Sequence, residues 1–194
     1  MDSHKLAVKF FADGSPELAH DAFIPVFHSW IQQHALKDHL LIDVADYAHV
    51  PDGPGTVLIA HEANISTDRE HGKLGLLYVR KQPIEGATNF PRRLASVFRA
   101  ALEAVAKLEE EVNLRGKLRF RGDELSFRIY DRLLAPNTPA TFEQLKPELL
   151  RFLSELYTGA PVSLTQAGKP DELFEIRVKA QATPTIATLR QRLG

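Results

Sequence analysis

Hydrophobic and polar residues alternate along several short stretches of the chain, while in others hydrophobic residues recur every three to four positions. A period of two predicts β-strands, and a period near 3.6 predicts amphipathic helices. Alternation predicts strands at residues 5–11, 40–47, 55–66, 73–79 and 173–180. It also predicts a hairpin at 117–133 that turns at Gly122 and Asp123. The helical period predicts helices at about 16–34, 90–112 and 141–159.

The order of these elements is β-α-β-β-β-α-β-β-α-β, in which strands come in groups separated by helices. Such grouping favours an α+β fold, with an antiparallel or mixed sheet and helices mainly on one face, over a doubly wound parallel sheet. The stretch "LGLLYV", residues 74–79, is apolar on both alternations. It therefore predicts a central strand, covered on both faces or buried at a subunit interface.

Length and composition limit the possible classes of function. With 194 residues and 44% hydrophobic content, the chain predicts one α+β domain over residues 1–180, followed by a tail at 181–194. The absence of cysteine excludes disulfides, thiolate metal sites and a cysteine nucleophile. A net charge of -1 offers no overall attraction for nucleic acid or anionic lipid. Without a long apolar stretch, we expect a soluble, cytoplasmic protein.

The region 40–66 holds the most concentrated candidate chemistry. His61 continues the apolar alternation of Val57 and Ile59, so we expect its ring to be buried on a strand, with Asp43 as a cross-strand partner. A histidine beside a carboxylate can bind a divalent metal ion or act as a general base. Glu62 and Asn64 point to the opposite face of the same strand. The alternative is that Asp43 and His61 are hydrogen-bonded polar residues at a sheet edge.

Asp131 and Arg132, in the loop "DRLLAPN" after the predicted hairpin, complete the set of candidate ligand-binding residues. The first hypothesis is therefore a small-ligand-binding or metal-ion-binding domain, possibly an enzyme. An alternative is a non-enzymatic homodimeric interaction module, because the strand at 74–79 is wholly apolar. A second alternative is weak binding of nucleic acid or phosphate through the basic hairpin at 117–132, although the nearby carboxylates argue against it.

Three segments together resemble a family of uncharacterised soluble bacterial proteins of about 200 residues. They are "LLIDVADYAHVPDGPGTVLIAHEANISTD", "GKLGLLYV" and "DRLLAPN". The resemblance implies a compact single domain, and it implies no activity, cofactor or catalytic residue.

Overall fold

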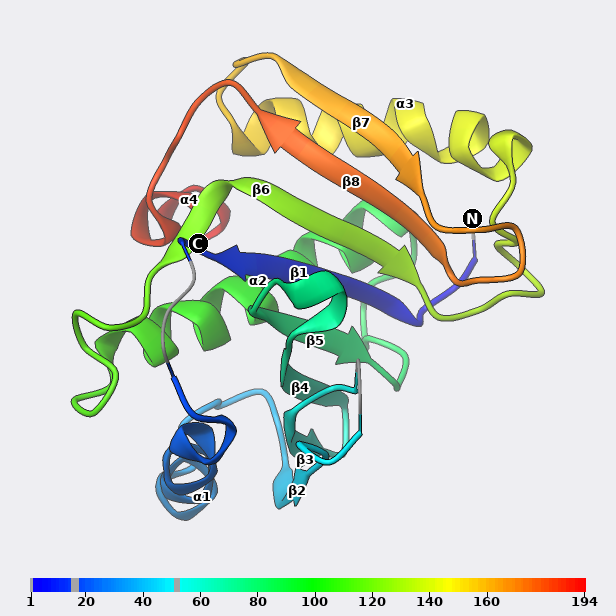
Figure 1. Cartoon of the computed structure of the whole chain (residues 1–194). Coiled ribbons are helices and arrows are strands. Elements are labelled where there is room, and N and C mark those ends of the chain that lie inside the picture. Colours follow the sequence, from blue (N-terminus) through cyan, green and yellow to red (C-terminus); the bar gives the residue numbers. More distant parts are fainter. Residues whose placement is uncertain (1, 15–17, 51–52) are drawn as a thin grey trace.

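The computed structural model describes residues 2–14, 18–50 and 53–194, and an eight-stranded sheet forms their centre (Figure 1). The strands are β1 (Leu6–Ala12), β2 (Leu41–Asp46), β3 (Thr56–Ala60), β4 (Ala63–Asp68), β5 (Gly75–Arg80), β6 (Phe120–Ile129), β7 (Val162–Ala167) and β8 (Phe174–Ala180). Their order across the sheet is β2-β3-β4-β5-β1-β6-β8-β7, and neighbouring strands run antiparallel. The predicted α+β class with an antiparallel sheet is confirmed.

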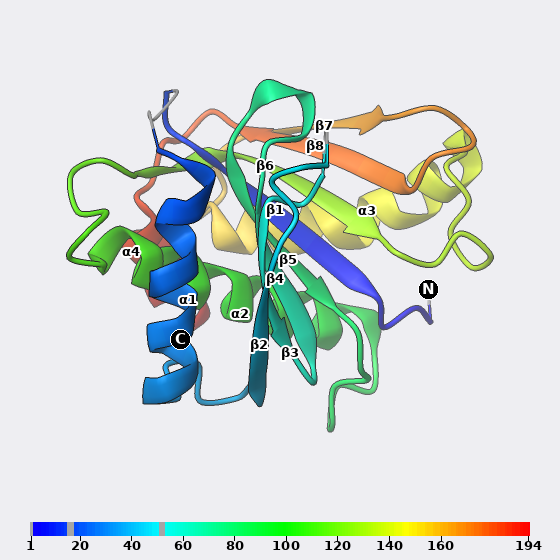
Figure 2. The ribbon, with the colours of Figure 1, turned by 60° about the horizontal axis from the view of Figure 1, so that its bottom comes forward.

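The described helices, except the short η2, cover one face of this sheet (Figures 1 and 2). They are η1 (His20–Phe23), α1 (Ile24–Gln33), η2 (Glu70–Gly72), α2 (Phe90–Glu110), α3 (Pro139–Leu156) and α4 (Ile186–Leu193). All the α-helices contribute side chains to a single buried hydrophobic cluster, whereas the short turn η2 lies on the opposite face. The predicted start of the first helix, at residues 15–17, lies outside the described residues.

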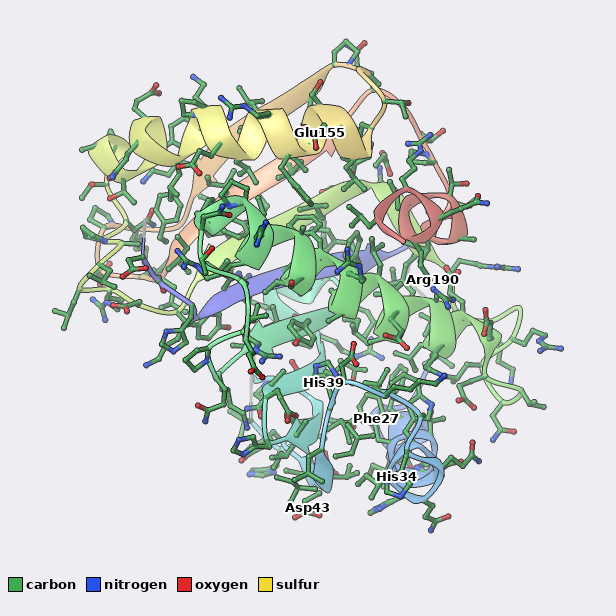
Figure 3. All side chains as sticks on the ribbon, turned by 180° about the vertical axis from the view of Figure 1, so that it is seen from behind. Phe27, His34, His39, Asp43, Glu155 and Arg190 are labelled. Carbon is green, nitrogen blue, oxygen red and sulfur yellow. The ribbon has the colours of Figure 1, made fainter. Side chains whose placement is uncertain are left out.

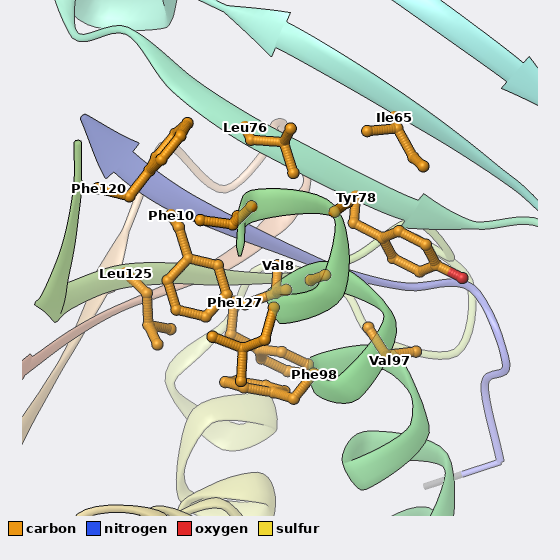
Figure 4. Packing of buried hydrophobic residues seen from close by; sticks show 14 of the residues in the cluster. Val8, Phe10, Ile65, Leu76, Tyr78, Val97, Phe98, Phe120, Leu125 and Phe127 are labelled. Atoms are coloured by element: carbon orange, nitrogen blue, oxygen red, sulfur yellow. The ribbon is translucent and has the colours of Figure 1, made fainter. Parts of the chain in front are cut away.

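Helix α2 lies at the centre of the hydrophobic core. It begins where sequence predicts, because the Asn89 side chain accepts a hydrogen bond from the N–H of Arg92 at 3.0 Å. In Figure 4 the strands direct apolar side chains toward this helix. The ring of Phe98 packs edge-on against Phe10 of β1 and Phe152 of α3, at centroid distances of 6.4 and 4.8 Å. Such aromatic contacts add to the free energy gained by burying the rings.

One turn of the sheet was not predicted, and one predicted turn is wrong. The stretch 55–66 is two strands rather than one, because the chain reverses at His61 and Glu62 between β3 and β4. The predicted hairpin at 117–132 is instead the continuous strand β6. Glycine is needed at position 122 because the backbone of Pro184 packs closely against it, and not because the chain turns there. A Cβ atom at this position would lie 1.9 Å from the carbonyl oxygen of Pro184.

Other segments extend or confirm the predicted arrangement. Strand β5 is central, and its Leu77 and Tyr78 are buried on opposite faces, as predicted. The edge strand β7 was not predicted, because its outward positions are polar and its pattern is weak. The predicted tail at 181–194 contains α4, whose Ile186 and Leu189 are buried. Among the described residues, no helix has the length and apolar character needed to span a bilayer.

Candidate functional site

The helix-free face of the sheet carries two cross-strand rows of side chains, which the strand register defines. One row runs Ile59, Asn64, Val79, Ala7, Arg128 and Glu175; the next runs Val57, Ser66, Leu77, Lys9, Ser126 and Arg177. The residues of these rows on β3, β4 and β5 are aliphatic except for Asn64 and Ser66, and we call this part the apolar half. The residues of the rows on β1, β6 and β8 are mostly charged, and we call this part the charged half. One sheet face is thus divided into two chemically distinct regions.

The apolar half is the floor of a cleft of about 660 Å³. Two of its walls are aromatic, since Tyr47 after β2 and Tyr130 after β6 both line it. The floor contributes four aliphatic side chains and two small polar ones: Val57, Ile59, Leu77, Val79, Asn64 and Ser66. The rim contributes Lys5, Pro54, Arg80 and Lys81. A concave apolar surface with a few polar groups is typical of small-molecule sites.

Asn64 is the distinctive polar group of this floor. It lies between Ile59 and Val79 on the neighbouring strands, and its buried Oδ1 has no hydrogen-bond partner among the described residues. An unsatisfied buried polar group costs about 1–3 kcal/mol. Asn64 as a whole is only partly buried and lines the cleft, and its amide carries both donors and an acceptor. A turn of the amide about its last torsion would present the acceptor to the cleft, where a ligand could hydrogen-bond to it.

In the charged half, by contrast, charged side chains lie against partners of opposite charge. Lys9 is buried and donates to Asp68 and to the carbonyl oxygen of Lys73, the latter at 3.1 Å. Burial lowers the pKa of Lys9 and raises the pKa of Asp68, while their mutual attraction opposes both shifts. The pair holds the end of β4 and the η2 segment against β1.

A second group in the charged half is centred on Arg128. Its guanidinium pairs with Glu70 of η2 and, at 3.0 Å, with Glu175 of β8. Ser126 donates to the same Glu175 carboxylate at 2.8 Å, and Arg177 pairs with it at 2.6 Å. Because these charges satisfy one another, we interpret the network as structural.

A separate polar pocket of about 430 Å³ lies beside the end of β5, between the sheet and α2. His39, labelled in Figure 3, lines this pocket, and its ring meets the Tyr78 hydroxyl at 2.8 Å. Burial raises the pKa of the Tyr78 phenol, so the phenol is neutral, and the tautomer of the His39 ring decides which of the two groups donates. Burial lowers the pKa of His39, in agreement with a neutral ring. Sequence reasoning missed His39, because it lies in a polar loop without periodicity.

Of the predicted metal pair, Asp43 lies on a strand, β2, as predicted, whereas His61 does not. His61 was predicted to be buried on a strand, and this is wrong: it is exposed in the turn between β3 and β4. Asp43 is exposed on the edge strand β2, at the margin of the molecule in Figure 3. Its carboxylate accepts the N–H of Val44 at 2.8 Å. Among the described residues, no group of three or more His, Asp or Glu side chains could hold a metal ion.

The other four predicted residues are spread over three places. Glu62 accepts the N–H of Leu40 at 2.8 Å and so fastens the start of β2 to the β3–β4 turn. Asp131 accepts the N–H of Leu134 at 3.1 Å, and the exposed Arg132 lines a different cavity, of about 380 Å³. Asn64 lies in the cleft. The structure does not bring the six predicted residues together.

The basic residues of 117–132 form no continuous cationic surface. Arg121 pairs with Asp123 at 2.7 Å and with Glu124 at 3.3 Å, and Arg128 is buried among carboxylates. Lys117 and Arg119 remain exposed. Comparisons with known proteins add no functional assignment: the chain matches no protein-family model, and a search of curated proteins finds no relative.

Proposed function

We propose that this protein binds a small, largely apolar molecule in the cleft on the helix-free face. The observation that carries the proposal is the buried, unpartnered amide oxygen of Asn64 on an otherwise aliphatic floor. In the charged half of this face, each charged side chain has a protein partner, and the one unpartnered atom among the described residues there, Oδ2 of Asp68, belongs to a carboxylate that already pairs with Lys9. A ligand with an apolar body and one hydrogen-bonding group would complement both the floor and the amide.

The size of the cleft also supports such a ligand. Adjacent strands are about 4.8 Å apart, and residues on one face of a strand repeat about every 6.8 Å. A floor three strands wide and two residues long therefore accommodates a body of roughly 10 by 7 Å, which is the size of a bicyclic ring. Burying about 200 Å² of apolar surface would contribute about 5 kcal/mol before the cost of association.

Fluorescence of the neutral apolar probe N-phenyl-1-naphthylamine tests the proposal. We expect saturable enhancement with the wild-type protein and its loss in Val57→Trp, because the indole would fill the cleft floor. The matched control is Thr165→Trp, which adds the same group at an exposed position of β7. Absence of saturable binding to a folded wild-type protein, or equal binding by Val57→Trp, would reject the proposal.

A second candidate function is self-association through strand β2. This strand is at the edge of the sheet. Leu40, directly before it, and Ile42 within it are 62% and 55% exposed. An edge strand with free backbone groups and exposed apolar side chains can extend a sheet in a second copy of the chain. Native mass spectrometry should then show a dimer that Ile42→Lys converts to a monomer, whereas Leu133→Lys, at another exposed leucine, should not. A wild-type protein that stays monomeric at about 100 µM, where a dimer with a dissociation constant of about 10 µM would already form, would reject it.

A further inference from the structure

Two lysines that line the cleft flank neighbouring antiparallel strands: Lys5 directly precedes β1, and Lys81 directly follows β5. Ala7 of β1 faces Val79 of β5, and two residues beyond this pair, on the same face, come Lys5 and Lys81. Both lysines line the cleft. The backbone also holds them in place, since the Lys5 carbonyl accepts the N–H of Tyr130 at 2.8 Å and the N–H of Lys81 donates to Glu62 at 2.8 Å.

Like charges at directly opposed positions of adjacent strands repel each other and destabilise the pair. No described carboxylate forms an ion pair with Lys5 or Lys81, and no described residue lining the cleft is acidic. The guanidinium of Arg80 adds a third positive charge, although the carbonyl oxygens of Gln82 and Pro83 already accept its hydrogen bonds at 2.7 and 3.1 Å.

The contrast with the neighbouring charged half is direct. There, Lys9 and Arg128 each have a carboxylate partner supplied by the protein. At the cleft the described residues supply cations and an amide, but no anion. An anionic group placed between the two ammonium groups would remove their repulsion, while its apolar body occupied the floor beside Asn64.

We propose that the ligand of this cleft is an organic anion, with one carboxylate or phosphate held between Lys5 and Lys81. This inference rests on the proposed function, because it names the class of ligand for the same site. The apolar body lies over Val57, Leu77 and Val79, and the headgroup lies at the end of the floor where β1 begins and β5 ends.

Isothermal titration calorimetry with ligands that share one ring system tests the inference. The probes are 2-naphthoate, 2-naphthyl phosphate and the neutral 2-naphthamide. Since an exposed charge pair contributes up to about fivefold in affinity, we expect the wild-type protein to bind the better anion about tenfold more tightly than the amide. The stronger of the two anions identifies the headgroup as carboxylate or phosphate.

The double variant Lys5→Met with Lys81→Met keeps the length of both side chains and removes both charges. It should bind the two anions about tenfold more weakly and 2-naphthamide within about twofold of wild type. The matched control, Lys117→Met with Lys169→Met, makes the same change in net charge at exposed lysines outside the cleft. It should bind all three probes like the wild type.

The outcomes separate this inference from the proposed function. If 2-naphthamide binds wild type as tightly as both anions, and Val57→Trp abolishes that binding, the cleft is a ligand site but its anion preference is wrong. Equal loss of anion binding in the control double variant would also overturn the roles of Lys5 and Lys81. If none of the probes, including N-phenyl-1-naphthylamine, binds the folded protein, both proposals fail.

Discussion

The two halves of the helix-free face belong to the same sheet but differ in whether their polar groups have partners within the protein. In the charged half, Arg128 and Glu175 lie on adjacent strands and pair at 3.0 Å. In the apolar half, Asn64 lies between aliphatic neighbours, and its Oδ1 has no partner among the described residues. A polar group that the fold satisfies stabilises the fold, whereas one that it leaves unsatisfied at a cleft is available to a ligand.

This difference also explains why conspicuous charge is a poor guide to the site. Lys9 and Arg128 are buried cations, which are rare in a sheet, yet each forms an ion pair with a carboxylate of the protein. Removing one member of a buried pair is costly because the other charge is left without compensation. The cleft, in contrast, should tolerate substitution with little loss of stability.

The largest expected effect comes from breaking the charged half at Arg128. Arg128→Met should lower the free energy of unfolding by about 3–5 kcal/mol, because Glu70 and Glu175 lose a buried cation. The measurement is urea denaturation at pH 7. As a control, Lys146→Met removes a surface pair with Glu143 and should change the value by less than about 1 kcal/mol. A loss at Arg128 no larger than that of the control would show that the network does not stabilise the fold.

A matched pair of neutral polar residues compares the halves directly. Ser126 donates to Glu175 at 2.8 Å, so Ser126→Ala should lower the free energy of unfolding by about 1–2 kcal/mol. Asn64→Leu removes an unpartnered amide and should change it by less than about 1 kcal/mol, in either direction. Urea denaturation of both variants measures this, and a greater loss at Asn64 than at Ser126 would reverse our assignment of the two halves.

Sensitivity to mild acid should come from a third place, the His39 pocket. Burial lowers the pKa of His39 in the folded protein, so the unfolded chain takes up this proton first as the pH falls. His39 should therefore reduce stability as the pH drops below its ordinary value of about 6.5, and have no such effect above it. Urea midpoints at pH 7.5 and 5.5 should differ less in His39→Gln than in wild type. An unchanged difference would assign the acid sensitivity to other groups.

The smallest expected effect is on polyanion binding, because the arginines of the charged half are already paired. At about 150 mM salt, we expect no binding of duplex DNA tighter than about 1 µM. Fluorescence anisotropy with a labelled duplex measures this. Submicromolar binding that is lost in the double variant Arg119→Glu with Arg121→Glu would show that the start of β6 offers a basic surface for DNA.

Of the residues selected from the sequence as a candidate site, Asn64 lies in the cleft, whereas His61 and Glu62 lie at the turn beside it. Asn64 was selected because it is a polar residue in an apolar strand, and it lies in the cleft. His61 was selected for the same reason, but the chain turns there and the ring is exposed. Small residues, Ala60 and Ala63, flank this turn, and no glycine or proline marks it, so the apolar alternation continues through it unchanged.

The sequence by itself determined the α+β class, helix α2, and the central position of β5. These depend on hydrophobic periodicity, which acts over a few residues. Only the tertiary structure decided that Asn64 lies beside Val79, that Lys5 and Lys81 line the same cleft, and that His39 meets Tyr78. Such pairs depend on strand order and register. Strand order and register depend on how the whole chain buries its apolar surface, so they cannot be predicted from the pattern of a few neighbouring residues.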